Sequence, residues 1–157
     1  MKRRLAATTV AVVGAAAVLA GCGGGSGRLS KSQYEQKLKD EGSALQASFG
    51  AISNNPGSLK DLAASVGRAQ KAADKAANDL DKLKPPKDAA ADNQKLAAAL
   101  HVVADEMGKL RSAADKGDQA GAAKVSQDLD SSPALKDAQA ATNDLKKKGY
   151  QVGVLGQ

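Results

Sequence analysis

A long amphipathic pattern runs through the middle of the chain. From residue 59 to residue 83, apolar side chains recur at alternating steps of three and four, which keeps them on one stripe of a helix. Ser58 stands at the N-cap position, and Pro85 disfavours helical backbone at the residue before it. The sequence therefore predicts a helix whose stripe is Leu59, Leu62, Val66, Ala69, Ala73, Ala76, Leu80 and Leu83.

Two further amphipathic segments lie on either side of this helix. The first opens at Ser30, with Gln33 as its capping-box partner, and ends before the turn sequence at 54–57. The other has Pro86 at its first position and should end at Gly117 in a left-handed conformation. Their stripes are Leu38, Leu45, Phe49 and Ile52 in the first, and Ala89, Asn93, Leu96, Leu100, Val103, Met107, Leu110 and Ala114 in the other.

A fourth segment follows Asp118, which is placed to cap it. Its pattern is interrupted at 131–133, where we expect a break or a kink, and it ends at Gly149. A Schellman cap at Gly149 would bring Tyr150 against Leu145. The apolar positions are Ala122, Val125 and Leu129 before the break, and Leu135, Ala138, Thr142 and Leu145 after it.

Four amphipathic segments joined by short turns predict an all-α fold, an up-down-up-down four-helix bundle over residues 29–150. The alternatives are a long helical hairpin that dimerises and an extended coiled coil. The turn signals between the segments favour compact antiparallel packing, and we expect a monomer. Residues 151–157 form a short C-terminal tail in which Val152, Val154 and Leu155 are free to pack on the bundle or not.

The three-four spacing also assigns the core. His101 follows Leu100 and is therefore rotated by about 100° from the stripe, so we expect it at or near the surface. The inward residues should be Leu62, Val66, Leu80, Leu96, Leu100, Val103, Met107, Leu110, Val125, Leu129 and Leu145.

The first 21 residues have the three parts of an export signal. Lys2, Arg3 and Arg4 precede an uncharged run that is too short for a comfortable membrane span, and the run ends in Leu19-Ala20-Gly21-Cys22. This tetrad resembles the lipobox of bacterial lipoproteins. The resemblance implies diacylglyceryl transfer to the Cys22 thiol, cleavage between Gly21 and Cys22, and acylation by fatty acids such as palmitate. A plain secretory signal with a chance cysteine and an uncleaved anchor are the alternatives.

Residues 22–28 would then be the lipidated cysteine and a glycine-rich tether. Beyond the tether, the stretch from Leu29 to Glu35 is similar to the start of the mature domain in small helical lipoproteins of high-GC Gram-positive bacteria, families largely without an assigned function. The resemblance implies an exported protein, lipid-anchored to the cell membrane and facing its extracytoplasmic side.

Export changes the charge of the chain. The whole sequence has 23 basic and 17 acidic residues, and removal of the signal leaves 20 and 17. Only Tyr34, Phe49 and Tyr150 are aromatic. A mildly basic domain with so few stacking side chains argues against nucleic acid as a partner. Because Cys22 is the only cysteine, its acylation would leave no thiol for a disulfide, a nucleophile or a metal.

Little in the sequence carries chemistry. A di-iron bundle needs glutamates paired with histidines, but the sequence has one histidine and three glutamates, none in that relation. The common serine triad would depend on His101 alone, and no nucleophile-elbow motif occurs. We therefore expect no enzyme, no cofactor and no metal site. Asn93, the polar residue on an otherwise apolar stripe, is more typical of register control than of ligand contact.

The basic end of the last helix is the remaining candidate site. Lys146, Lys147 and Lys148 would meet anionic lipid headgroups or wall polymers, although cations at a helix C-terminus are also favoured by its dipole.

Two functions follow as hypotheses. The first is a non-enzymatic, lipid-anchored envelope lipoprotein that acts as an interaction or scaffolding module for another envelope protein. The second is a protein that binds a small ligand or an anionic polymer through a bundle groove or the basic helix end. An exposed apolar strip would favour the first, and an enclosed cavity with convergent polar groups the second.

Overall fold

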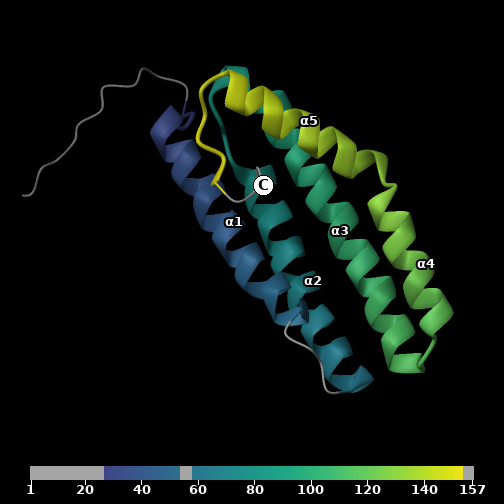
Figure 1. Ribbon diagram of the computed structural model, residues 1–157. Helices are drawn as coiled ribbons and strands as arrows, with labels where there is room; N and C mark the ends of the chain where they lie inside the picture. The colour runs from purple at the N-terminus through teal and green to yellow at the C-terminus, as the bar shows by residue number, and fades with distance from the viewer. Residues whose placement is uncertain (1–26, 54–57, 154–157) are drawn as a thin grey trace, which may run out of the picture.

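Every regular element in the described part of the protein is helical. The structure is a computed structural model that describes residues 27–53 and 58–153. Its elements are α1 (Lys31–Ser53), α2 (Leu59–Lys82), the 3-10 turn η1 (Lys87–Ala89), α3 (Ala90–Lys116), α4 (Gln119–Asp130) and α5 (Pro133–Lys147). Together, α4 and α5 take the place of the fourth helix of a bundle. The chain therefore forms the predicted all-α, up-down-up-down four-helix bundle, with its fourth helix broken in two (Figure 1).

The predicted helix ends are largely confirmed by their caps. Ser30 and Gln33 form the capping box of α1, because each backbone N–H donates to the other's side chain, at 2.9 and 3.3 Å. Ser58 accepts from the backbone of Asp61 at the start of α2. Gly117 ends α3 with a φ of 69°, a left-handed conformation that glycine adopts without strain.

The start of α3 differs from the prediction. Pro86 was expected at the first helical position, but its φ of −50° and ψ of 149° are those of extended backbone. The chain first closes the tighter turn η1, in which the Ala89 N–H donates to the Pro86 carbonyl at 3.0 Å, and only then enters α3. The short turn satisfies a group that a helix N-terminus leaves unpaired.

The break in the fourth helix is confirmed. Pro133 has no N–H to continue the hydrogen-bond ladder of α4, and instead it stands in the first turn of α5. The Ser131 and Ser132 amides donate to the carbonyls of Gln127 and Leu129, which closes the end of α4.

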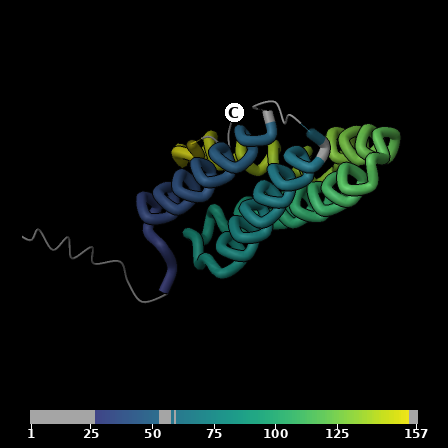
Figure 2. The backbone as a smooth tube through the Cα atoms, turned by 90° about the horizontal axis from the view of Figure 1, so that it is seen from below, coloured from purple at the N-terminus to yellow at the C-terminus, as the bar shows by residue number. Residues whose placement is uncertain are grey.

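Helices α2 and α3 form the centre of the bundle. Helix α1 packs on α2, whereas α4 and α5 pack on α3 (Figures 1 and 2). Alanines make the central contact close, since Ala69, Ala73 and Ala77 of α2 and Ala97 and Ala104 of α3 are buried almost completely. A small side chain at each contact lets two helices approach at the short end of the usual interaxial range of about 8–10 Å.

The buried apolar residues fall into two clusters. The proximal core, near the start of α1, draws on α1, α2, η1, α3, α5 and the C-terminal segment. Its buried members are Tyr34, Leu38, Leu80, Ala89, Leu96, Ala97, Ala141, Leu145, Tyr150 and Val152. The distal core consists of Leu45, Ala73, Ala76 and Ala104, which come from α1, α2 and α3. Helix α4 contributes no buried residue.

This division corrects half of the predicted core. Val66, Leu80, Leu96, Met107 and Leu145 are buried, as expected. The other predicted core residues are only half-buried, and two of them belong to α4, which contributes no buried residue. They are Leu62, Leu100, Val103, Leu110, Val125 and Leu129.

A C-terminal segment closes the proximal core. Gly149 has a φ of 79°, and the Tyr150 amide donates to the Leu145 carbonyl at 2.9 Å, which is the predicted Schellman arrangement. Tyr150 and Val152 are buried in the proximal core, so the start of the tail does pack on the bundle. Val154 and Leu155, the other apolar residues of the tail, lie outside the described residues.

Two tyrosines meet inside the proximal core. The rings of Tyr34 and Tyr150 pack edge to face, with centroids 5.8 Å apart and planes at 84°. The Tyr150 hydroxyl donates to Asp88 Oδ1 at 2.9 Å, whereas the Tyr34 hydroxyl is buried without a hydrogen-bond partner among the described residues. Burial raises the pKa of both phenols, with the hydrogen bond to Asp88 as a further cause for Tyr150, whose pKa rises to about 12.

Leu80→Ala should destabilise the protein by about 2–5 kcal/mol, because Leu80 is fully buried and its removal leaves a cavity. Leu110→Ala should cost less than half as much, since Leu110 is half-buried. His101→Ala should stay within about 0.5 kcal/mol, as for other surface changes. Denaturant unfolding of the three variants measures these free energies, and equal losses at Leu80 and Leu110 would contradict the division of the core.

Tyr34→Phe and Tyr150→Phe should have opposite effects on stability. The first removes a buried hydroxyl that lacks a partner and should stabilise the fold by about 1 kcal/mol. The second removes the hydrogen bond to Asp88 and should cost about 0.5–1.5 kcal/mol. Urea unfolding at neutral pH compares the pair, and a loss at Tyr34 as large as at Tyr150 would show that the Tyr34 hydroxyl is bonded.

Alkaline pH should weaken the proximal core. The folded pKa of Tyr150 lies above the ordinary value of 10.0, so the contribution of this phenol to stability is complete below pH 10.0 and is lost as the pH rises through about 12. The free energy of unfolding should therefore fall between these two pH values. The fall should be shallower in Tyr150→Phe, and identical curves for the two proteins would refute the assignment.

Candidate functional site

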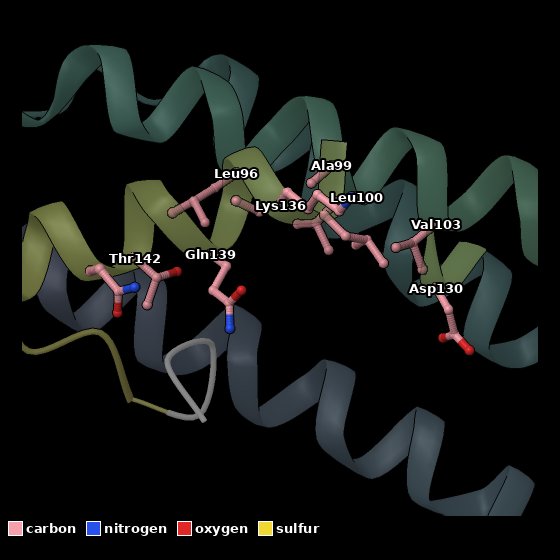
Figure 3. A pocket seen from close by; sticks show the side chains of 11 residues that line it. Leu96, Ala99, Leu100, Val103, Asp130, Lys136, Gln139 and Thr142 are labelled. Atoms are coloured by element: carbon pink, nitrogen blue, oxygen red, sulfur yellow. The ribbon is translucent and has the colours of Figure 1, made fainter. Parts of the chain in front are cut away.

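A groove lies between α3 and the α4–α5 arm. Its volume is about 450 Å³. Figure 3 shows Val103 and Asp130 at one end of the groove and Leu96 and Thr142 toward the other. The lining residues are Leu96, Ala99, Leu100 and Val103 of α3, Asp130 at the end of α4, and Leu135, Lys136, Ala138, Gln139, Thr142 and Asn143 of α5.

The sequence explains why the space is not filled. Ala99 and Ala138 place single methyl groups at positions where larger side chains would meet across the two helices. The break before Pro133 also separates α4 from α5, so a straight fourth helix does not cover α3 along its whole length. The groove therefore has an apolar floor of half-buried Leu100, Val103 and Leu135.

Polar residues line the rim of the groove rather than its floor. Asp130, Lys136, Gln139 and Asn143 are all exposed to solvent. Thr142 is the buried polar residue of the lining. This arrangement is an open apolar strip with a polar border, which is typical of a surface that binds another macromolecule.

The apolar lining is elongated along α3. Its members on that helix run from Leu96 to Val103, seven residues apart, or roughly 10 Å along the helix. The apolar strip therefore follows the bundle axis.

A second group of polar contacts lies at the proximal end. Lys148 Nζ donates to Asp92 Oδ2 at 2.7 Å and to the Asp88 carbonyl at 2.8 Å, and it lies 3.3 Å from Asp144 Oδ2. The side chain of Asp92 is 4% exposed, so Lys148 supplies the counter-charge that a buried carboxylate requires. The hydrogen bond to Asp92 raises the pKa of Lys148.

The predicted lysine cluster is therefore divided in its roles. Lys146, Lys147 and Lys148 are all exposed at the end of α5, but Lys148 also holds α5 to the start of α3. The sequence pattern did not reveal this partner of Lys148, because Asp92 is a charged residue next to the stripe position of Asn93. An acid in the first turn of a helix is common, and the pattern gave no sign that this one is buried.

Two residues singled out by the sequence have structural contacts. Asn93 is buried, and its side-chain amide donates to the Leu80 carbonyl at 2.8 Å, so it links α3 to α2 as a register residue would. His101 has a side chain 43% exposed, and its Nε2 lies 2.9 Å from Asp81 Oδ2. The predicted position of His101 near the surface is confirmed.

The described residues contain no group of three or more His, Cys, Asp or Glu side chains placed to hold a metal ion. In the same residues, no helix combines the length and the apolar character needed to cross a membrane. Gly21 and Cys22, the predicted cleavage and lipidation residues, lie outside the described part of the chain.

Comparison with known protein families, with curated proteins and with solved structures finds no match in any of the three.

Proposed function

We propose that the protein is a non-enzymatic envelope lipoprotein, anchored by acyl chains on Cys22, that binds a helical segment of another envelope protein. The proposed anchor rests on the likeness of Leu19-Ala20-Gly21-Cys22 to a lipobox. The proposed binding rests on the groove between α3 and the α4–α5 arm.

The shape of the apolar strip is the observation that carries this proposal. A strip that follows α3 for roughly 10 Å matches an amphipathic helix, which buries apolar residues at steps of three and four along a groove. The exposed polar residues of the rim, among them Lys136 and Gln139, are placed to contact the polar flanks of such a helix.

A small-ligand binder is the second candidate. The groove volume of about 450 Å³ falls within the usual range for small-molecule sites, about 300–1,000 Å³. Such sites, however, place a few polar groups inside an apolar cavity. Here Thr142 is the one buried polar lining residue, and the other polar lining residues belong to the rim. The groove thus fits a helix better than it fits a small polar molecule.

Cys22→Ala should leave the protein without lipid, because the chain has no other thiol. Cells grown with a labelled fatty acid should incorporate label into the unsubstituted protein and none into the variant. Two acyl chains hold a protein stably at a membrane where one does not, so the variant should also leave the membrane fraction. Label retained on the variant would refute the proposed anchor.

A photocrosslinking residue at Gln139 should capture the partner, because Gln139 lines the groove and is exposed. Ala138→Leu should lower the yield of that product several-fold by filling the groove. Ala140→Leu is the matched control, since Ala140 is an exposed residue of the same helix that does not line the groove.

The two alanine variants separate groove binding from general effects. Both add the same side chain to α5, and both should keep the helical circular dichroism of the parent protein. Equal capture by Ala138→Leu and Ala140→Leu would show that the partner does not use the groove.

A further inference from the structure

We propose that the proximal end of the bundle is a second interaction surface, which rests on the anionic phospholipid headgroups of the membrane. This inference depends on the proposed lipid anchor and adds an orientation to it. The bundle would stand with one end on the bilayer.

Three chain segments distant in sequence meet at this end. They are the residues that lead into α1, the connection between α2 and α3, and the end of α5 (Figure 1). Contacts hold them together: Arg28 Nη1 donates to the Pro85 carbonyl at 2.9 Å, and the Leu29 amide donates to the Lys84 carbonyl at 2.7 Å. Lys31 Nζ lies 4.8 Å from the centre of the Tyr150 ring.

Each segment brings exposed basic residues to the same end. Lys148 pairs internally with Asp92. Five basic residues at this end lie outside the predicted lysine cluster at 146–148. The exposed basic residues of the proximal end are Arg28, Lys31, Lys82, Lys84, Lys87, Lys146, Lys147 and Lys148.

The net charge of the bundle is concentrated there. Among residues 28–157 there are 20 basic and 17 acidic residues. Residues 28–35, 80–92 and 144–153 hold eight of the basic and five of the acidic residues. Twelve residues of each sign remain in the rest of the bundle. Two of the five acids are also engaged internally, since Asp92 is buried against Lys148 and Asp88 accepts from Tyr150.

The opposite end of the bundle has no such excess. Around the turn between α3 and α4, Arg111 and Lys116 stand beside Asp115 and Asp118. Arg111 Nε lies 3.8 Å from Asp115 Oδ2, and Asp118 caps α4. The charge asymmetry therefore runs along the bundle axis.

The tether places the basic end at the membrane. Gly27 is the fifth residue after Cys22, and even a fully extended chain over those five steps spans no more than about 18 Å. The tether therefore lets the end that bears the start of α1 reach the headgroups, within the roughly 8 Å over which charges attract at physiological salt. Basic residues so close to an anionic surface are attracted to it.

The groove would then open to the side, above the membrane. Its α3 lining runs from Leu96 to Val103, which are six and thirteen residues beyond Ala90, or roughly 9–20 Å along the helix. A partner helix held near the bilayer would meet the groove at that height.

The test uses the full lipidated chain in vesicles of phosphatidylcholine, with or without phosphatidylglycerol. Because acylation consumes the Cys22 thiol, Gln94→Cys or Gln119→Cys supplies the single free thiol for a fluorescent probe at the proximal or the distal end. Nitroxide-labelled lipid quenches probes close to the bilayer. Phosphatidylglycerol should increase quenching several-fold at position 94 and little at 119, and high salt should reverse the increase.

Charge reversal provides the matched comparison. Lys84→Glu with Lys87→Glu should abolish the increase at position 94, whereas Lys60→Glu with Lys71→Glu changes the net charge equally and should preserve it. All four lysines are exposed, so both variants should retain the helical circular dichroism.

The outcomes separate this inference from the proposed anchor. Protein that fails to float with vesicles of either composition would refute the anchor. Protein that floats but shows the same quenching with and without phosphatidylglycerol would refute the headgroup contact alone. A fall in quenching on addition of an anionic wall polymer to phosphatidylcholine vesicles, without any response to phosphatidylglycerol, would assign the basic end to the polymer and also overturn the proposal.

Discussion

The close contact between α2 and α3 is the constraint on which the other helices depend. The two helices carry alanines that are almost completely buried, namely Ala69, Ala73, Ala77, Ala97 and Ala104. An alanine buries far less apolar area than a leucine, so such an interface gains stability mainly through close packing along its length. Larger side chains come from the neighbours of this pair as well, since α1, α5 and the C-terminal segment add Tyr34, Leu38, Leu145 and Tyr150 to the proximal core.

Local sequence signals were sufficient for most of the backbone. Caps at Ser30, Ser58 and Asp118, the left-handed Gly117 and the break before Pro133 are decided by residues a few positions apart, and the structure confirms each of them. The extent of burial was not decided locally. A three-four stripe states which side of a helix is apolar, but not whether a neighbour covers it, and the stripe of α4 contains no buried residue.

The candidate sites show the same limit. An exposed apolar strip was one of two predicted outcomes, but its place between α3 and the α4–α5 arm depends on how the break at 131–133 separates two helices. Asp92 pairs with Lys148, and Tyr34 packs against Tyr150. These contacts join residues from three distant stretches of the chain. No periodicity links them, because the C-terminal segment meets the start of α1 only through the tertiary packing of the proximal core.

The absence of buried residues in α4 has a consequence for how the bundle fluctuates. Segments with few buried contacts open at a lower free energy than the fold as a whole. Helix α4 can therefore separate from α3 while the proximal core, which contains α5 but no part of α4, stays intact. Each such opening would lengthen the apolar strip toward the distal end. The groove is thus one member of a family of shapes, and the occupant that binds it would select among them by how far it reaches along α3.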